Sequence, residues 1–170
     1  MITLTLLSIA CILSYTLSVC IKFKGIPNSI SASFYSLEHK WWFRFTMWLT
    51  PILLLPSILE ASTENTQFLA FLAIVGMIIV GCFPDFVADN FNRRGHEVGA
   101  VMCLVFSQLW VAFNNPWFLL PWIVYLIYTI IQMVWSWDGK FYTAFLKTKP
   151  MFWVEVFALL CTYLSLLFSL

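Results

Sequence analysis

Long apolar stretches separated by short polar segments dominate the pattern along this chain. The first stretch, residues 1–21, holds no charged residue and ends at Lys22. Because about 20 apolar residues in a helix span the hydrocarbon core of a bilayer, this stretch predicts a membrane-spanning helix. Five more stretches of this kind follow, at residues 41–60, 67–83, 96–113, 117–137 and 151–170. The pattern predicts an all-α integral membrane protein, a six-transmembrane-helix bundle that forms a single membrane domain over residues 1–170.

Turn-forming residues set the boundaries between the predicted helices. The polar segment 61–66 separates the second stretch from the third, and Pro84 and Asp85 end the third. No charged residue occurs from Val98 to Trp137, a stretch too long for one span, and Asn114-Asn115-Pro116 provides a turn signal in its middle. We therefore expect two helices there, joined by a tight hairpin.

Composition agrees with a lipid environment. The chain is 62% hydrophobic and 10% charged, and its mean hydropathy is +0.89. This leaves too little polar surface to cover a water-soluble globule of 170 residues. The net charge of +1 argues against nucleic acid as a partner, because phosphate binding requires a clustered basic surface. The five cysteines lie in apolar runs without metal-ligand spacing, so we expect small buried residues.

All nine basic residues flank three of the five predicted connections. They are Lys22, Lys24, Lys40 and Arg44 at the first connection, Arg93 and Arg94 at the third, and Lys140, Lys147 and Lys149 at the fifth. The second and fourth connections carry only Glu60 and Glu64. With six spans the odd-numbered connections share one side, which the positive-inside rule assigns to the cytoplasm. We expect a multi-pass protein of a bacterial inner membrane with both termini outside.

A first group of candidate catalytic residues lies at the third connection and the start of the helix that follows it. The group consists of Asp85, Asp89, His96 and Glu97. Carboxylates and an imidazole could act as general acid and base, and Asp85, Asp89 and His96 could bind a divalent metal. The alternative assigns the same residues to turns, to ion pairs with neighbouring arginines, and to a first helical turn, where the dipole favours an acid.

The first connection is the second candidate site. Hydroxyl-bearing residues alternate with apolar ones between Pro27 and Tyr35, which predicts an extended or re-entrant segment with one polar face. The candidate contacts to a lipid head group or a partner are Ser29, Ser31, Ser33, Tyr35 and His39. The alternative is an interfacial loop that dips its apolar side chains into the membrane.

Few polar residues fall within the predicted spans. Glu155 is the one acid clearly inside a span, and this position makes it a functional candidate, although it could also pair with Lys149. We expect Gln108 to link helices. A channel made of several copies would instead use the polar residues of the fourth and fifth helices, which are Ser107, Gln108, Thr129 and Gln132.

The segment Pro27-Asn-Ser-Ile-Ser-Ala-Ser-Phe-Tyr35 resembles the P-x-S-I-S-x-(T/S)-Y-Y segment of small uncharacterised membrane proteins from Bacteroidetes bacteria and their phages. Further matches are Trp41-Trp42, His96-x-x-Gly99-Ala100 and Ser107-Gln108-Leu109-Trp110, so the resemblance covers most of the chain. Pro84-Asp85 followed by H-x-x-G-A is remotely similar to six-helix families of unknown function related to the FGF-receptor-activating and autophagy-modulator membrane proteins. Neither resemblance implies a catalytic residue.

Three functional hypotheses follow from these patterns. The first is a non-enzymatic protein without a cofactor that binds lipid, a membrane-protein partner or a second copy of itself through its cytoplasmic face. The second is a membrane-embedded lipid hydrolase, with a divalent metal as its candidate cofactor. The third is a small oligomeric channel or transporter.

Overall fold

The computed structural model describes all residues from Met1 to Leu170, and 79% of them are helical, with no strand. The long helices are α1 (Ile2–Phe23), α2 (Trp41–Glu60), α3 (Gln67–Cys82), α4 (Asn90–Asn114), α5 (Pro121–Trp135) and α7 (Pro150–Ser169). The short ones are η1 (Ser31–Ser36), η2 (Pro116–Leu119) and α6 (Phe141–Lys147). The predicted all-α class is confirmed.

Five helical segments are long and apolar enough to cross a membrane. They are Ile2–Phe23, Trp41–Glu60, Asn90–Asn114, Pro116–Trp135 and Pro150–Ser169. The remaining apolar helix, α3, has 16 residues, a length of about 24 Å at 1.5 Å per residue, against a hydrocarbon core of about 30 Å. These helices indicate a multi-pass membrane protein, and the count of six spans stays a prediction.

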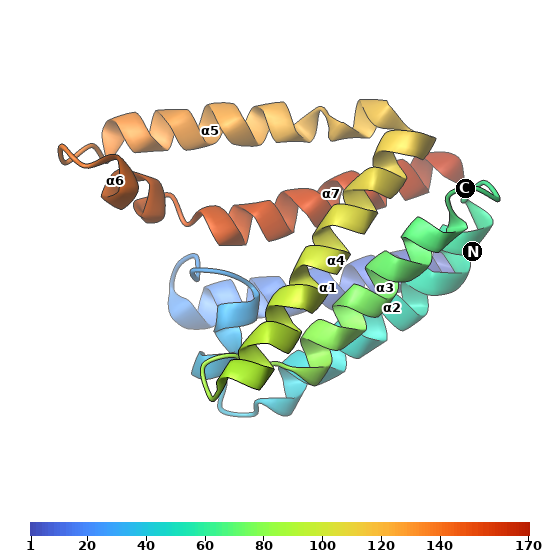
Figure 1. Cartoon of the computed structure of the whole chain (residues 1–170), viewed down its shortest axis with the longest axis horizontal. Helices are drawn as coiled ribbons and strands as arrows, with labels where there is room; N and C mark the ends of the chain where they lie inside the picture. The colour runs from blue at the N-terminus through green and yellow to red at the C-terminus, as the bar shows by residue number, and fades with distance from the viewer.

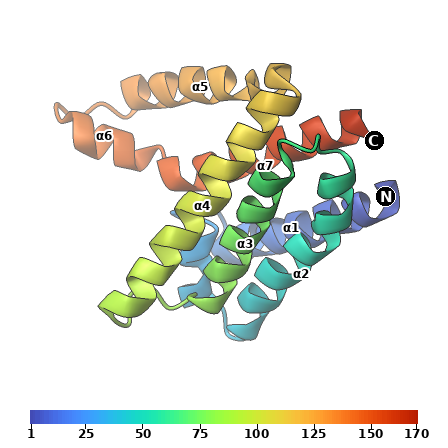
Figure 2. The ribbon, with the colours of Figure 1, turned by 45° about the vertical axis from the view of Figure 1, so that its right-hand side comes forward.

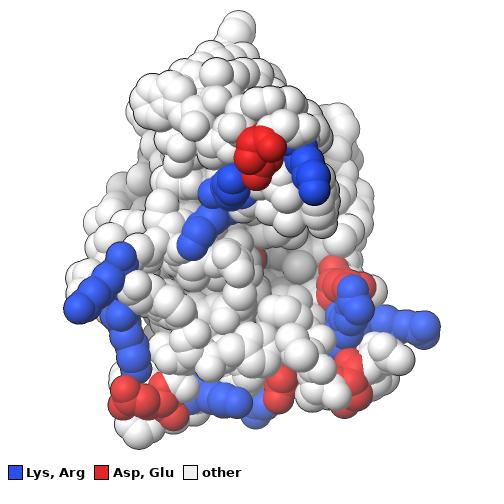
Figure 3. Space-filling model, turned by 90° about the vertical axis from the view of Figure 1, so that its left-hand side faces the viewer, with Lys and Arg blue, Asp and Glu red and all other residues white.

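The long helices run back and forth between two ends of the molecule (Figure 1). The connections α1–α2, α3–α4 and α5–α7 lie at one end, on the left of the picture, and both termini lie at the other end. The lysines and arginines therefore gather at the end that holds the three long connections, as the space-filling view shows (Figure 3). We call this the basic end.

Helices α3 and α4 approach each other closely through glycines. A Cβ atom added at Gly76 would lie 2.4 Å from the backbone nitrogen of Cys103 and 2.8 Å from the carbonyl oxygen of Gly99. Gly95, Gly99 and Cys103 follow one another at four-residue spacing on α4, the pattern that lets two helices in a membrane pack backbone against backbone. Packing of these two helices therefore depends on the absence of side chains.

Helix α5 lies at the edge of the bundle beside α6 and α7 (Figures 1 and 2). Its contacts with α7 are aromatic: the ring centroids of Tyr125 and Phe157 are 5.5 Å apart, and those of Tyr128 and Trp153 are 5.2 Å apart. The apolar side chains on its other faces, such as Ile130, are exposed. Most of α5 is therefore free to face lipid.

The helices differ from the sequence prediction at α4, at α5 and in the fifth connection. α4 begins at Asn90 rather than 96, because the Asp89 side chain accepts a hydrogen bond from the Asn92 backbone at 2.8 Å and caps the helix. The predicted helix 117–137 is divided into η2 and α5, since Pro121 lacks the N–H that would continue the first turn. The fifth connection, predicted as a loop, contains α6.

The expectation of an extended first connection is wrong, because Ser31–Ser36 forms the 3₁₀ helix η1. Local hydrogen bonds hold the turn: Ser29 Oγ accepts from the Ala32 backbone at 2.8 Å, and Ser33 Oγ donates to the Ile30 carbonyl at 2.6 Å. Serine side chains compete in this way with extended backbone pairing. Over so few residues, an alternating pattern does not distinguish a two-residue period from a three-residue one.

Candidate functional site

An apolar cavity of about 120 Å³ lies between α1, α2, α3, α4 and α7. Hydrophobic side chains make up 14 of its 18 lining residues. The four polar residues that line it are Ser31, Ser107, Glu155 and Thr162. An engineered cavity of comparable size with apolar walls stays dry and takes up a small apolar molecule. The cavity can therefore accommodate an apolar group of about that size.

The side chain of Glu155 connects α7 to the first connection at the wall of this cavity. Its carboxylate accepts a hydrogen bond from the backbone N–H of Ile30 at 2.5 Å and one from the Ser31 hydroxyl at 3.3 Å. It forms no salt bridge, and Lys149, its alternative partner in the sequence, donates to the Ile26 carbonyl instead. Glu155 therefore holds the first connection over the cavity by two hydrogen bonds.

Further hydrogen bonds fasten the first connection to α1 and α7. The hydroxyls of Ser33 and Tyr15 are 2.6 Å apart, and the Asn28 carbonyl accepts from the Phe152 backbone at 3.1 Å. Ile30 and Phe34 are buried in the hydrophobic core. The segment thus packs as a cover on the bundle, and we call residues 26–36 the cover.

The residues predicted to contact lipid head groups are divided between the inside and the surface. Ser31 and Ser33 are buried and use their hydroxyls within the protein, and Ser29 supports the turn. Tyr35 and His39 are exposed, and the Tyr35 hydroxyl accepts from the Val87 backbone at 2.8 Å. The structure therefore does not bring these five residues together on one outward face.

The acids of the third connection have local partners. Asp89 is exposed and bonds both the backbone and the side-chain nitrogen of Asn92, at 2.8 Å and 2.7 Å. The Asn92 backbone N–H lowers the pKa of Asp89. Glu97 pairs with Arg93 at 2.9 Å. These contacts match the alternative of capping and ion pairing that the sequence left open.

His96 is buried in the second turn of α4 and forms no hydrogen bond with the acids of this group. Its Nδ1 lies 2.9 Å from the Phe83 carbonyl oxygen, and its ring centroid is 4.4 Å from that of Phe86. Asp85, which precedes His96 in the third connection, is half-buried. No group of three or more His, Cys, Asp or Glu side chains is placed so that it could hold a metal ion. The geometry gives the metal-dependent hydrolase no support, and that hypothesis stays a prediction.

Gln108 links three helices, which confirms its predicted role. Its Nε2 donates to the Ala158 carbonyl of α7 at 3.1 Å, and its Oε1 accepts from Trp122 Nε1 of the α5 segment at 2.8 Å. Of the four residues proposed for a channel, only Ser107 lines the cavity. Thr129 is buried elsewhere, on α5. Ser107 and Gln108 contact each other at 3.1 Å without Thr129, and the channel made of several copies stays a prediction.

Comparison with known proteins finds no matching family model, no similar curated protein and no similar solved structure. The resemblances of the Pro27–Tyr35 segment therefore stay expectations.

No direct sign of the cavity is visible in the amino-acid sequence. Three alanines, Ala73, Ala100 and Ala158, line it from α3, α4 and α7. Small residues that face one another leave unfilled space, and this is the signal that could have pointed to the cavity. Such a signal is weak, because alanine is also an ordinary residue of close helix contacts in membranes.

Proposed function

We propose that this protein is a six-span membrane protein that binds lipid in the cavity beneath the cover. The observation that carries the proposal is an apolar cavity of about 120 Å³ among five helices, with one carboxylate at its wall. Its size suits the end of one acyl chain or an apolar group of similar volume. The protein acts in this proposal as a binding protein, and no residue is assigned a catalytic role.

The walls and the cover support access from the membrane. Ala100, Leu104 and Leu159 line the cavity on the side of α4 and α7 and are only half-buried, so the barrier between cavity and lipid is thin there. The cover is a short 3₁₀ helix and its flanking turns, fastened to Glu155 by two hydrogen bonds. Opening the cover would break these bonds and expose Ile30 and Phe34, but it would not require a membrane helix to unwind.

The proposal includes a sixth span and an orientation. α3 runs antiparallel to α2 and α4, with its ends near theirs (Figure 1). A helix shorter than the hydrocarbon core can still cross, since the bilayer thins locally at a modest cost. All lysines and arginines lie near the basic end, which supports placing that end in the cytoplasm of a bacterial cell and both termini outside.

Photocrosslinking tests the cavity. The probe is phosphatidylcholine with a diazirine near the end of one acyl chain, incorporated into vesicles with the protein and located by mass spectrometry. We expect crosslinks on Met47, Met77 and Cys103, which line the cavity from three helices. Ala100→Leu and Ala158→Leu fill the space from α4 and α7, and each should lower these crosslinks at least several-fold.

Ala112→Leu is the matched control, because Ala112 is a half-buried alanine of α4 that does not line the cavity. It should leave the crosslinks unchanged. Two filling variants on different helices, each shown to be folded by its thermal unfolding in detergent, separate a filled cavity from a misfolded protein. Crosslinks confined to lipid-facing residues such as Leu13 and Leu17, at equal yield in every variant, would overturn the proposal.

A further inference from the structure

A second hollow also borders the cover and shares no lining residue with the cavity. It has a volume of about 390 Å³ and is formed by the end of α1, the cover and Lys149, which directly precedes α7. Its polar side chains are Lys24, Asn28, Ser36 and Lys149, and no acidic residue lines it. We call this hollow the lysine recess. It lies at the basic end of the molecule, where α1 ends and α7 begins.

The backbone at both lysines has an uncommon conformation. Lys24 has φ of 52° and Lys149 has φ of 55°, and these are the only two residues other than glycine with positive φ. Glycine or asparagine normally occupies such positions, because a larger side chain is disfavoured there. Uncommon backbone conformations that are retained tend to gather at functional sites. At Lys24 this conformation closes the end of α1, and at Lys149 it leads the chain into Pro150 at the start of α7, so both lysines lie at helix ends that border the recess.

The two lysines of the recess also lack acidic partners. Lys22 pairs with Glu38 at 2.8 Å and Lys147 with Asp138 at 2.8 Å, so the lysine two positions before each recess lysine has an acidic partner. Lys24 and Lys149 form no salt bridge, and Lys149 donates only to the Ile26 carbonyl. The recess therefore presents two positive charges that the protein leaves uncompensated.

The neighbouring helix ends agree with a negative ligand. α7 begins at Pro150, and the positive end of its dipole adds to the charge of Lys149. The carbonyl groups at the C-terminal end of α1 carry the negative end of its dipole. Two of them are hydrogen-bonded, because the Lys24 N–H donates to the Ile21 carbonyl at 3.1 Å and the Gly25 N–H to the Cys20 carbonyl at 3.0 Å. The local field in the recess thus favours an anion.

We propose that the lysine recess binds the phosphate of an anionic phospholipid head group. Lysine binds phosphate as a point charge, and lysines at the end of a membrane helix attract anionic lipids. Asn28 and Ser36 add side-chain donors, and Phe23 and Ile26 bring apolar surface to the recess, where acyl chains would begin. This site shares no lining residue with the cavity, which is proposed to take an apolar group.

Native mass spectrometry of the detergent-purified chain tests the recess. The probes are phosphatidylglycerol, phosphatidylcholine with the same acyl chains, and inorganic phosphate. We expect one phosphatidylglycerol to bind about thirtyfold more tightly than phosphatidylcholine, given the usual contribution of two juxtamembrane lysines. Lys24→Gln with Lys149→Gln should abolish that preference, whereas Lys40→Gln with Lys140→Gln removes two charges without acidic partners from the same connections outside the recess and should keep it.

A second double variant distinguishes loss of the two charges from misfolding. Lys24→Gly with Lys149→Gly removes both charges and places glycine where the backbone conformation favours it, so it should fold and still lose the preference. Equal losses in the recess and control variants would overturn the site in favour of diffuse attraction. Displacement of the lipid by millimolar inorganic phosphate would overturn its assignment to a head group. Ala100→Leu should keep the preference, so that failure of the cavity and failure of the recess are distinguishable.

Discussion

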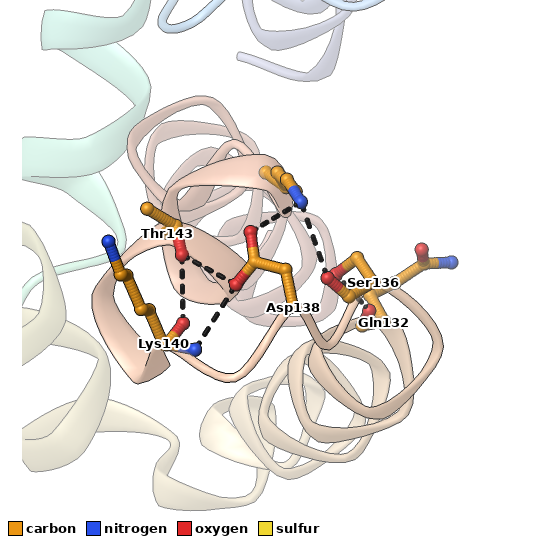
Figure 4. A network of polar contacts seen from close by, with 6 residues as sticks. Gln132, Ser136, Asp138, Lys140 and Thr143 are labelled. Carbon is orange, nitrogen blue, oxygen red and sulfur yellow. Dashed lines mark hydrogen bonds and ion pairs between the residues drawn. The ribbon is translucent and has the colours of Figure 1, made fainter.

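At the scale of single residues, Asp138 organises the fifth connection. Its carboxylate accepts from Lys147 Nζ at 2.8 Å, from the Thr143 hydroxyl at 2.7 Å and from the Lys140 backbone at 3.2 Å (Figure 4). The hydrogen bond from Lys147, followed by that from Thr143, lowers the pKa of Asp138 to about 2. The ionised carboxylate therefore ties the start and end of α6 to the turn before it.

This pKa gives a testable pH dependence. Because the pKa of Asp138 is lower in the folded protein than its ordinary value of 3.8, its contribution to local order is complete above about pH 4 and is lost as the pH falls toward 2. Carbon-13 NMR of labelled aspartate in micelles should show one carboxyl that titrates near pH 2. Asp138→Asn identifies it by removing the signal.

Lys147→Gln removes the largest cause of the low pKa. The titration midpoint of Asp138 should then rise toward 3.8. Lys149→Gln, on the same connection but without an acidic partner, should leave it unchanged. A wild-type midpoint at or above 3.8 would contradict the network in Figure 4.

At the scale of helices, the contact between α3 and α4 depends on glycine. A side chain at Gly76 would meet backbone atoms of Cys103 and Gly99, which cannot rotate away as a side-chain end can. The Gln108 side chain links α4 to α7 and to α5 by hydrogen bonds. Helices α3 and α4 therefore pack by close approach of their backbones, whereas α5 at the edge of the bundle is attached by polar and aromatic contacts.

We expect Gly76→Leu and Gly99→Leu to force α3 and α4 apart. Overpacking of this kind lowers the free energy of unfolding by about 1–3 kcal/mol, and more where backbone must move. Unfolding in detergent with increasing sodium dodecyl sulfate measures the change. Gly25→Ala is the control, because nothing lies within 4 Å of its added Cβ. Leucine variants as stable as Gly25→Ala would show that the two helices do not touch there.

At the scale of the whole molecule, the sixth span decides the topology. If α3 crosses the membrane, residue 64 before it and residue 88 after it lie on opposite sides. Glu64→Cys and Ala88→Cys are both at exposed positions, and each can be made in a background without the five native cysteines. A membrane-impermeant maleimide should label Glu64→Cys in intact cells and Ala88→Cys only after permeabilisation. Equal labelling of both would mean that α3 does not cross.

The sequence by itself determined the helical class and the separation of charge. Hydropathy acts locally, residue by residue, so stretches such as residues 1–21 and 151–170 already specify membrane helices. The intramembrane position of Glu155 marked it as unusual for the same reason, because a charge in lipid is costly wherever its partner lies. Helix ends were less certain: the Asp89 cap that starts α4 could be interpreted equally well as part of a catalytic group.

Only the tertiary structure decided which polar groups meet and where space is left. Glu155 meets Ile30 and Ser31 from far along the chain, and Lys24 and Lys149 share one recess for the same reason. Such meetings depend on how helices pack, which local patterns do not encode. A cavity depends on what neighbouring side chains fail to fill, and that is a property of the assembled bundle. Local serine hydrogen bonds hold η1, but only the assembled bundle provides the core in which Ile30 and Phe34 are buried.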